Sequence, residues 1–184
     1  VIAQYGADTL RVYEMFMGPL TQTKEWDDSN VAGIHRFLSR IYRHFLGNEN
    51  KNQINDKECL AKDLKILHKT IKKVTEDIES LSFNTSIAQM MIFLNQVSES
   101  QCHNREIMGT FLKLLCPFAP HLAEELWYRC ILEEKSSPEK ASYRYLSQIE
   151  WPVFDKNLIV DDEITLGVQI NGKHRGEILI RMNA

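Results

Sequence analysis

Three arginines at helical spacing are the side chains of this sequence best suited to binding an anion. Arg36, Arg40 and Arg43 stand at positions i, i+4 and i+7 of the stretch DDSNVAGIHRFLSRIYRHFLGN, with no acid between the first and the last. On a helix this spacing places them on one face, and guanidinium groups are well suited to phosphates. The alternative is a solvated face that pairs with acids on neighbouring helices, because the chain holds 25 acidic residues. The pattern therefore predicts either a phosphate-binding face or a solvated face paired with acids.

Sequence patterns for catalysis or metal binding are missing. There is no GxGxxG and no GxxxxGK[ST], so no phosphate-cradling loop is predicted. His121 with Glu124 and Glu125 lacks the HExxH arrangement that places two histidines over zinc. We interpret these acids as lying near the positive start of a capped helix. The sequence therefore predicts no catalytic residue and no metal site.

The spacing of the cysteines predicts neither a metal site nor a disulfide framework. Cys59, Cys102, Cys116 and Cys130 stand far apart and form no CxxC pair. A zinc site and a secreted disulfide scaffold are both poor interpretations of this spacing. We interpret Cys102 and its neighbour His103 as an incidental surface pair. A reduced, cytoplasmic compartment is expected.

Composition agrees with an ordinary globular chain. The 184 residues are 43% hydrophobic and 26% charged, with a net charge of −3. No apolar run reaches the roughly 20 residues of a membrane span, and no signal-peptide pattern opens the chain. A mildly acidic chain can still bind nucleic acid through one local basic face.

Apolar periodicity predicts six helices joined by short connections, which is typical of an antiparallel bundle. Asp8 is expected to cap the first helix, and Ser86 with Gln89 stands at capping-box spacing in the fourth. Pro120 suits the first turn of the last helix. The predicted helices cover about residues 8–17, 27–47, 60–81, 82–100, 104–116 and 121–134.

One of these helices has an apolar seam of coiled-coil type. Its apolar residues are spaced alternately by four and three positions. This seam is the basis of a competing hypothesis, a helical protein-interaction module without RNA binding. The seam consists of Leu60, Leu64, Leu67, Ile71, Val74, Ile78 and Leu81.

The last part of the chain changes to a period of two. Alternation from Ile164 to Ile170, then Asn171-Gly172, then HRGEILI predicts a β-hairpin. A lone hairpin is marginal in water, and the chain opens without a methionine, so both ends are expected to belong to something larger. The predicted fold class is mainly α, an antiparallel helical bundle followed by a short hairpin from a truncated C-terminal domain.

Five blocks of the sequence resemble a known family. YGADTLRVYEMFMGPL resembles the stretch after the KMSKS signature in class I aminoacyl-tRNA synthetases of the leucine, isoleucine and valine group. KEWDDSNVAGIHRFLSRIYR, FNTSIAQMMIFLN, CPFAPHLAEELW and VQINGKHRGEI are similar, in order and spacing, to leucyl-tRNA synthetases of bacterial type. An isoleucyl or valyl enzyme is the alternative, but the NGK hairpin and the lack of cysteine clusters argue against it.

The resemblance implies three parts. Residues 1–25 would form a stem-contact-like connector from the catalytic domain. Residues 26–150 would form the helical anticodon-binding domain. Residues 151–184 would form a linker and the first hairpin of a truncated C-terminal domain.

The resemblance also implies a function. The family joins leucine to its tRNA using ATP and magnesium, but the HIGH and KMSKS signatures and the editing domain are not in this sequence. The fragment is therefore expected to be inactive and to hold no cofactor, and to position leucine tRNA through backbone and shape contacts as a cytoplasmic monomer within a longer polypeptide. Arg11 is expected to serve either tRNA or the domain junction. The residues expected to bind tRNA are Arg36, Arg40, Arg43, Lys24, Lys173 and Arg175.

Overall fold

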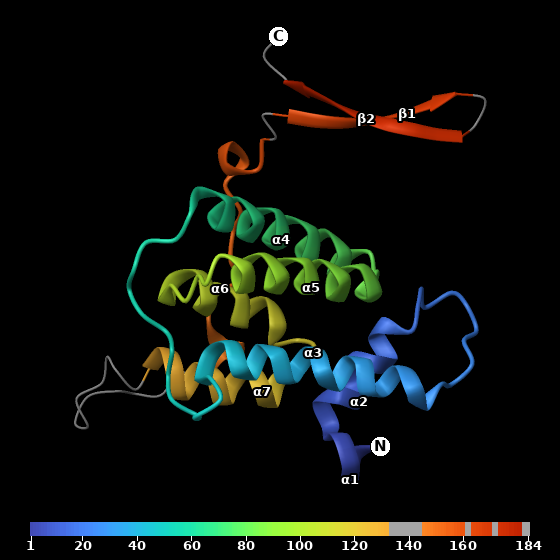
Figure 1. Cartoon of the computed structure of the whole chain (residues 1–184). Coiled ribbons are helices and arrows are strands. Elements are labelled where there is room, and N and C mark those ends of the chain that lie inside the picture. The colour runs from blue at the N-terminus through green and yellow to red at the C-terminus, as the bar shows by residue number, and fades with distance from the viewer. Residues whose placement is uncertain (133–144, 161–162, 171–172, 182–184) are drawn as a thin grey trace. The chain divides into compact units, whose positions relative to one another are not determined.

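The computed structural model describes residues 1–132, 145–160, 163–170 and 173–181. The chain divides into two compact units, residues 1–154 and 155–184. Among these described residues, seven α-helices lie in the first unit and two strands in the second, which confirms the predicted fold class (Figure 1). The three-part domain division stays a prediction. The helices are α1 (Ile2–Tyr5), α2 (Ala7–Phe16), α3 (Asp28–Leu46), α4 (Ala61–Glu79), α5 (Phe83–Glu99), α6 (Arg105–Leu115) and α7 (Pro120–Leu126).

The second unit contains an antiparallel hairpin. Strand β1 (Glu163–Ile170) pairs with β2 (Lys173–Arg181), and the register shifts between Val168 and Gln169. The predicted turn at 171–172 and most of the predicted linker at 135–145 lie outside the described residues.

The first unit is a layered bundle. In Figure 1, α4 lies over α5 and α6, and α3 runs beside α7 on the other side of α5. α2 packs against α3, α5 and α7. A π-helical segment, Trp127–Leu132, continues α7. No helix among the described residues combines the length and apolarity that a membrane span needs.

Large apolar side chains fill the centre of the bundle. Phe45, Phe93, Phe111 and Phe118 are almost completely buried. The rings of Phe93 and Phe111 stack with centroids 4.8 Å apart. Met90 is fully buried, as expected of a methionine that fills core space. These contacts join α3, α5 and α6 into one core.

A ladder of polar side chains joins α4 to α5. Asp63 is completely buried and accepts hydrogen bonds from Gln96 Nε2 at 3.0 Å and Ser100 Oγ at 2.8 Å. Its other carboxylate oxygen accepts the Leu60 amide at 3.1 Å, which caps the start of α4. One carboxylate therefore ties the beginning of α4 to the end of α5.

The ladder repeats one and two heptads further along α4. Gln89 Nε2 donates to Thr70 Oγ1 at 3.0 Å, and Thr85 Oγ1 donates to Asp77 at 2.7 Å. Because buried polar groups are costly without partners, only one antiparallel register of the two helices satisfies this ladder. We call the side chains Asp63, Thr70 and Asp77, with their α5 partners, the polar ladder.

The apolar seam of α4 is covered, in its middle part, by other helices of the same chain. Leu67, Ile71 and Val74 are buried in the bundle, whereas Leu60 and Leu81 at its ends are more than half exposed. Since the middle of the seam already packs on other helices of this chain, it is not available for a coiled-coil dimer. This counts against the interaction-module hypothesis.

Two predicted caps are wrong. α5 begins one turn before the predicted capping box, at Phe83, so Ser86 lies inside the helix and its buried Oγ has no hydrogen-bond partner. Asp8 does not cap its own helix. Its carboxylate accepts the Leu122 amide at 2.7 Å and pairs with His121 Nδ1 at 2.7 Å, so it caps α7. Tertiary contacts override the local spacing in both cases.

The cysteine interpretation is wrong for one pair. Cys59 and Cys102 form a disulfide with their Cα atoms 5.6 Å apart, although 43 positions separate them in sequence. The α4–α5 hairpin brings the two together because one precedes α4 and the other follows α5. Cys102 is also buried, and His103 stacks on His44 with ring centroids 4.3 Å apart, so neither is an incidental surface residue.

Removing the Asp63 carboxylate tests the polar ladder. Asp63→Ala removes the acceptor of Gln96 Nε2 and of the Leu60 amide, and one of the acceptors of Ser100 Oγ, all of them partly buried. We expect the free energy of unfolding to fall by about 2–4 kcal/mol. Ser86→Ala is the matched control, since that buried hydroxyl has no partner to lose. Urea denaturation curves in which both variants lose equal stability would contradict the ladder.

The buried His44 predicts a pH dependence of stability. Its pKa is lowered to about 4, mainly by burial and in smaller part by the nearby His103, against a hydrogen bond to the Cys102 carbonyl that raises it. In the unfolded chain histidine takes up a proton below about pH 6.5, so the unfolded state binds more protons in this window. The free energy of unfolding should therefore fall by about 2 kcal/mol between pH 7 and pH 5.

The variant His44→Gln checks this origin. Denaturation curves at pH 7 and pH 5 should show a smaller loss for His44→Gln than for the natural chain. A smaller loss of stability between pH 7 and pH 5 should remain in this variant, because burial also lowers the pKa of His103. His35→Gln, which changes an exposed histidine, should leave the loss unchanged. An undiminished loss in His44→Gln would refute the assignment.

Candidate nucleic-acid interface

Local hydrogen bonds set the start of α3, the helix that carries the three arginines. Asp27 is the N-cap, and its carboxylate accepts the Ser29 amide at 2.9 Å and the Ser29 hydroxyl at 2.7 Å. These two bonds lower the pKa of Asp27. Tyr13 of α2 donates its hydroxyl to the Asp27 carbonyl at 2.9 Å, which joins the start of α3 to the bundle.

The far end of α3 is also set locally. Gly47 has φ of 63°, a conformation that glycine adopts without a steric cost, and its amide closes the helix on the Arg43 carbonyl. Gln53 lies close against this glycine, so a Cβ there would meet its side chain. The predicted bounds of α3 are thereby confirmed at both ends.

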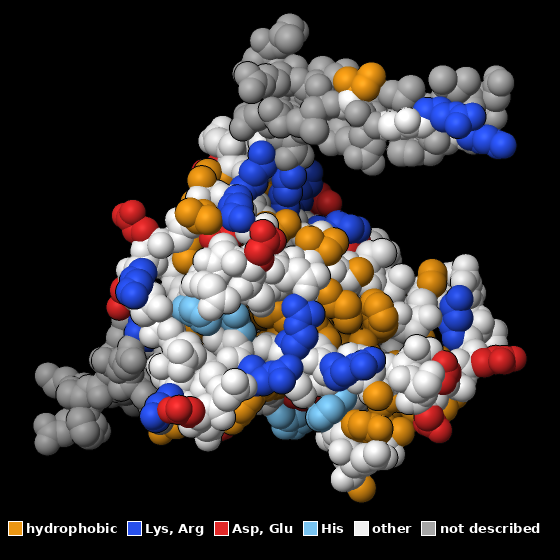
Figure 2. Space-filling model, in the orientation of Figure 1, with side chains coloured by type: hydrophobic (Ala, Val, Ile, Leu, Met, Phe, Trp, Pro, Cys, Tyr) orange, Lys and Arg blue, Asp and Glu red, His pale blue; other side chains and the backbone are white. Residues whose placement is uncertain are grey.

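The two faces of α3 differ sharply. Ile34, Phe37, Ile41 and Phe45 face the core and are buried. The three arginines lie on the opposite face and are exposed. In Figure 2, Lys and Arg side chains gather over α3, with a second group over α4. The sequence correctly predicted this separation of faces. We call Arg36, Arg40 and Arg43 the arginine face.

The arginine face is without acidic partners in the part of the chain that the structure describes. Arg40 Nη2 donates to Asn95 Oδ1 of α5 at 2.7 Å, a neutral partner that leaves the positive charge uncompensated. By contrast, α4 carries its own acids: Lys72 pairs with Glu76 and Lys73 with Asp77. The charge over α3 is therefore more available to an anion than the charge over α4.

Two polar residues beside α3 are not indicated by the sequence pattern. Asn95 orients Arg40 from another helix. Arg129, in the π-helical segment, donates to Tyr42 Oη at 3.3 Å and pairs with Glu125 at 3.6 Å. The hydrogen bond to Tyr42 raises the pKa of Arg129. Neither residue shares a local spacing with the arginine face, so only the tertiary structure brings them to it.

The remaining predicted site residues lie elsewhere. Lys24 is exposed in the segment between α2 and α3, and lines a surface hollow of about 650 Å³ with Phe16, Ile34 and others. Lys173 and Arg175 are exposed on β2, in the second unit. Arg11 donates to the Pro117 carbonyl at 3.0 Å, which gives it a structural contact within the bundle. The structure thus brings together only the three arginines of α3.

Another arginine has a purely structural position. Arg105 at the start of α6 is buried, pairs with Asp56 at 3.0 Å and donates to the Cys130 carbonyl at 2.9 Å. It holds the segment before α4 against the π-helical segment. The presence of an arginine alone therefore does not distinguish an interface residue from a structural one, whereas the exposure of its side chain does.

The family model for the anticodon-binding domain of tRNA ligase matches residues 64–184. Curated leucine–tRNA ligases are similar over nearly the whole chain. That of Chlorobaculum parvum is 45% identical over 96% of this chain and 21% of its own length. That of Parabacteroides distasonis is 42% identical over 95% of this chain and 17% of its own length. The chain thus spans about a fifth of the length of these relatives.

A solved structure has the same fold. It is the crystal structure of the ternary complex of Agrobacterium radiobacter K84 agnB2 LeuRS with tRNA and LeuAMS. The TM-score is 0.74 at 28% sequence identity, covering 100% of this chain and 24% of that one.

Substitution of the exposed arginines and of the buried arginine should change stability by different amounts. Changing Arg36, Arg40 and Arg43 together to glutamine should alter the free energy of unfolding by no more than about 1 kcal/mol, because the three are solvated. Arg105→Gln should cost about 2–4 kcal/mol, since it leaves buried carbonyls without a donor. Thermal unfolding of the two variants checks this. A large loss in the triple variant would mean that the arginine face serves the fold.

The chain belongs to the anticodon-binding domain family of tRNA ligases, and its relatives over nearly its whole length are leucine–tRNA ligases, which confirms the resemblance that the five sequence blocks indicate.

Proposed function

We propose that this chain is the tRNA-positioning part of a leucine–tRNA ligase and that the arginine face of α3 contacts the phosphate backbone of leucine tRNA. The complex of the structural neighbour contains tRNA, which supports tRNA as the partner. Lys24, Lys173 and Arg175 add further phosphate contacts. The fragment itself carries out no chemistry.

One observation carries this proposal. Three exposed guanidinium groups share one helix face, and in the described residues they have no acidic partner. Cations of this kind neutralise backbone phosphates and fix the orientation of a nucleic acid without reading its sequence. Preference for leucine tRNA then follows from its shape and not from its anticodon bases.

The rest of the enzyme supplies the reaction. Leucine is joined to its tRNA in a catalytic domain outside this sequence, where ATP and magnesium bind. The polypeptide acts as a cytoplasmic monomer, and the bundle holds the tRNA while its acceptor end reaches the catalytic domain.

A binding titration over a series of salt concentrations tests the proposal. The natural chain is titrated with leucine tRNA and with one unrelated tRNA, alongside the variant in which Arg36, Arg40 and Arg43 are glutamine. We expect the slope of log affinity against log salt to fall by about two to three in the variant, as release of counterions from three phosphates requires.

A matched control removes three positive charges from another part of the helical unit. Lys57 just before α4 and Lys62 and Lys72 within it, changed together to glutamine, should leave the slope of log affinity against log salt nearly as it is in the natural chain. If both triple variants flatten the slope equally, binding is diffuse electrostatic attraction and the arginine face is not the footprint. Salt-insensitive binding of the natural chain would also overturn the proposal.

A further inference from the structure

The base of the α4–α5 hairpin is closed by a pair of cysteines. Cys59 lies two positions before α4 begins, and Cys102 lies three positions after α5 ends. Their Cα atoms are 5.6 Å apart, within the range that a disulfide spans without backbone movement. The bond therefore encloses the complete hairpin, with the whole polar ladder inside it.

Contacts other than the bond itself hold the two cysteines together. The Asp63 carboxylate ties the Leu60 amide, next to Cys59, to Ser100 near Cys102. Asn104 Nδ2 donates to the Lys57 carbonyl at 2.9 Å on the same side of the bundle. Because these bonds do not involve sulfur, the two thiols of a reduced chain remain neighbours and are poised to form the bond again.

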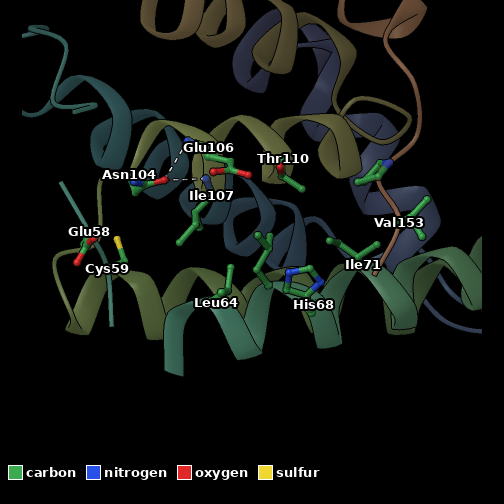
Figure 3. A pocket seen from close by; sticks show the side chains of 12 residues that line it. Glu58, Cys59, Leu64, His68, Ile71, Asn104, Glu106, Ile107, Thr110 and Val153 are labelled. Atoms are coloured by element: carbon green, nitrogen blue, oxygen red, sulfur yellow. Dashed lines mark hydrogen bonds between the residues drawn. The ribbon is translucent and has the colours of Figure 1, made fainter. Parts of the chain in front are cut away.

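The two sulfurs differ in access. Cys102 is only 3% exposed, and its carbonyl accepts a hydrogen bond from His44 at 2.9 Å. Cys59 is half-buried and lines a pocket of about 350 Å³. Figure 3 shows Cys59 beside Glu58 at one end of this pocket, with Glu106 and His68 further along it. A small molecule can therefore reach Cys59 but not Cys102.

We infer that Cys59 and Cys102 are a reversible thiol–disulfide site, with Cys59 the thiol that a peroxide oxidises and Cys102 the thiol that resolves it. Carboxylates beside Cys59 favour an uncharged oxidant such as hydrogen peroxide over an anionic one. Redox-sensing cysteines are accessible to solvent and often lie next to a second cysteine that resolves the oxidised form. In a reducing cytoplasm such a bond forms and breaks instead of persisting.

The chemistry balances within the pair. The Cys59 thiolate attacks one oxygen of the peroxide, an S–O bond forms, the O–O bond breaks, and the departing hydroxide is protonated to water. The Cys102 thiolate then attacks the Cys59 sulfur, the S–S bond forms and the second oxygen leaves as water. Two thiols and one peroxide give one disulfide and two waters. A dithiol reductant reverses the change and is itself oxidised.

Oxidation should tighten the hairpin. A crosslink across 43 positions removes much of the freedom of the unfolded chain. We expect the melting temperature of the helical unit to rise by on the order of 10 °C on oxidation. α5 also carries Asn95, which orients Arg40, so the same bond steadies one edge of the arginine face.

The test compares the whole chain treated with hydrogen peroxide and with dithiothreitol. Thiol titration in denaturant should count four free thiols in the reduced chain and two, those of Cys116 and Cys130, in the oxidised chain. Peptide mapping of the oxidised chain should find Cys59 joined to Cys102. The oxidised sample should melt higher, and dithiothreitol should restore the lower value. Cys59→Ser should abolish this difference, and Cys116→Ser should keep it.

Three results would overturn the inference. The first is four titratable thiols after peroxide treatment. The second is a melting temperature that does not depend on redox state, or a difference that survives in Cys59→Ser. The third concerns metal, because ligand atoms of Cys59, Asp63 and Cys102 lie within 4.8 Å of one another. If zinc added to the reduced chain binds one to one and blocks both thiols from oxidation, the pair is a metal site instead.

Discussion

The buried carboxylate of Asp63 is the interaction on which the arrangement of this bundle depends most. It caps α4, receives two donors from the end of α5, and lies beside the cysteine pair. A buried charge without partners would be strongly unfavourable, so these donors fix both the register of the hairpin and the path of the chain before it. The apolar seam of α4 alone would allow several registers, because one leucine or isoleucine packs much like another.

The arginine face depends on this hairpin indirectly. α5 is the helix that α4 holds in register, and it contacts both α2 and α3. It supplies Asn95 to Arg40, and its Phe93 packs in the core with the inner face of α3. The exposed cations are therefore presented by a rigid scaffold, which reduces the entropy that binding a large, stiff nucleic acid would cost.

Local signals made α3 predictable, and long-range contacts made other features unpredictable. Asp27, Gly47 and the apolar spacing between them all lie within one segment, so sequence alone gave the bounds and the exposed face of this helix. Asp8 caps α7 by accepting the amide of Leu122, 114 positions away, and Cys59 meets Cys102 only through the hairpin register. Likewise nothing local separates the buried Arg105 from the exposed Arg36. Their difference arises from which side of each helix the other helices cover.

An ¹⁵N NMR titration with leucine tRNA that follows the arginine side-chain Nε–Hε resonances would show directly whether the arginine face binds tRNA. We expect the resonances of Arg36, Arg40 and Arg43 to shift or broaden together, while that of Arg105, already paired with Asp56, stays in place. Unchanged resonances for all three α3 arginines at a tRNA concentration that saturates the fragment would contradict this expectation.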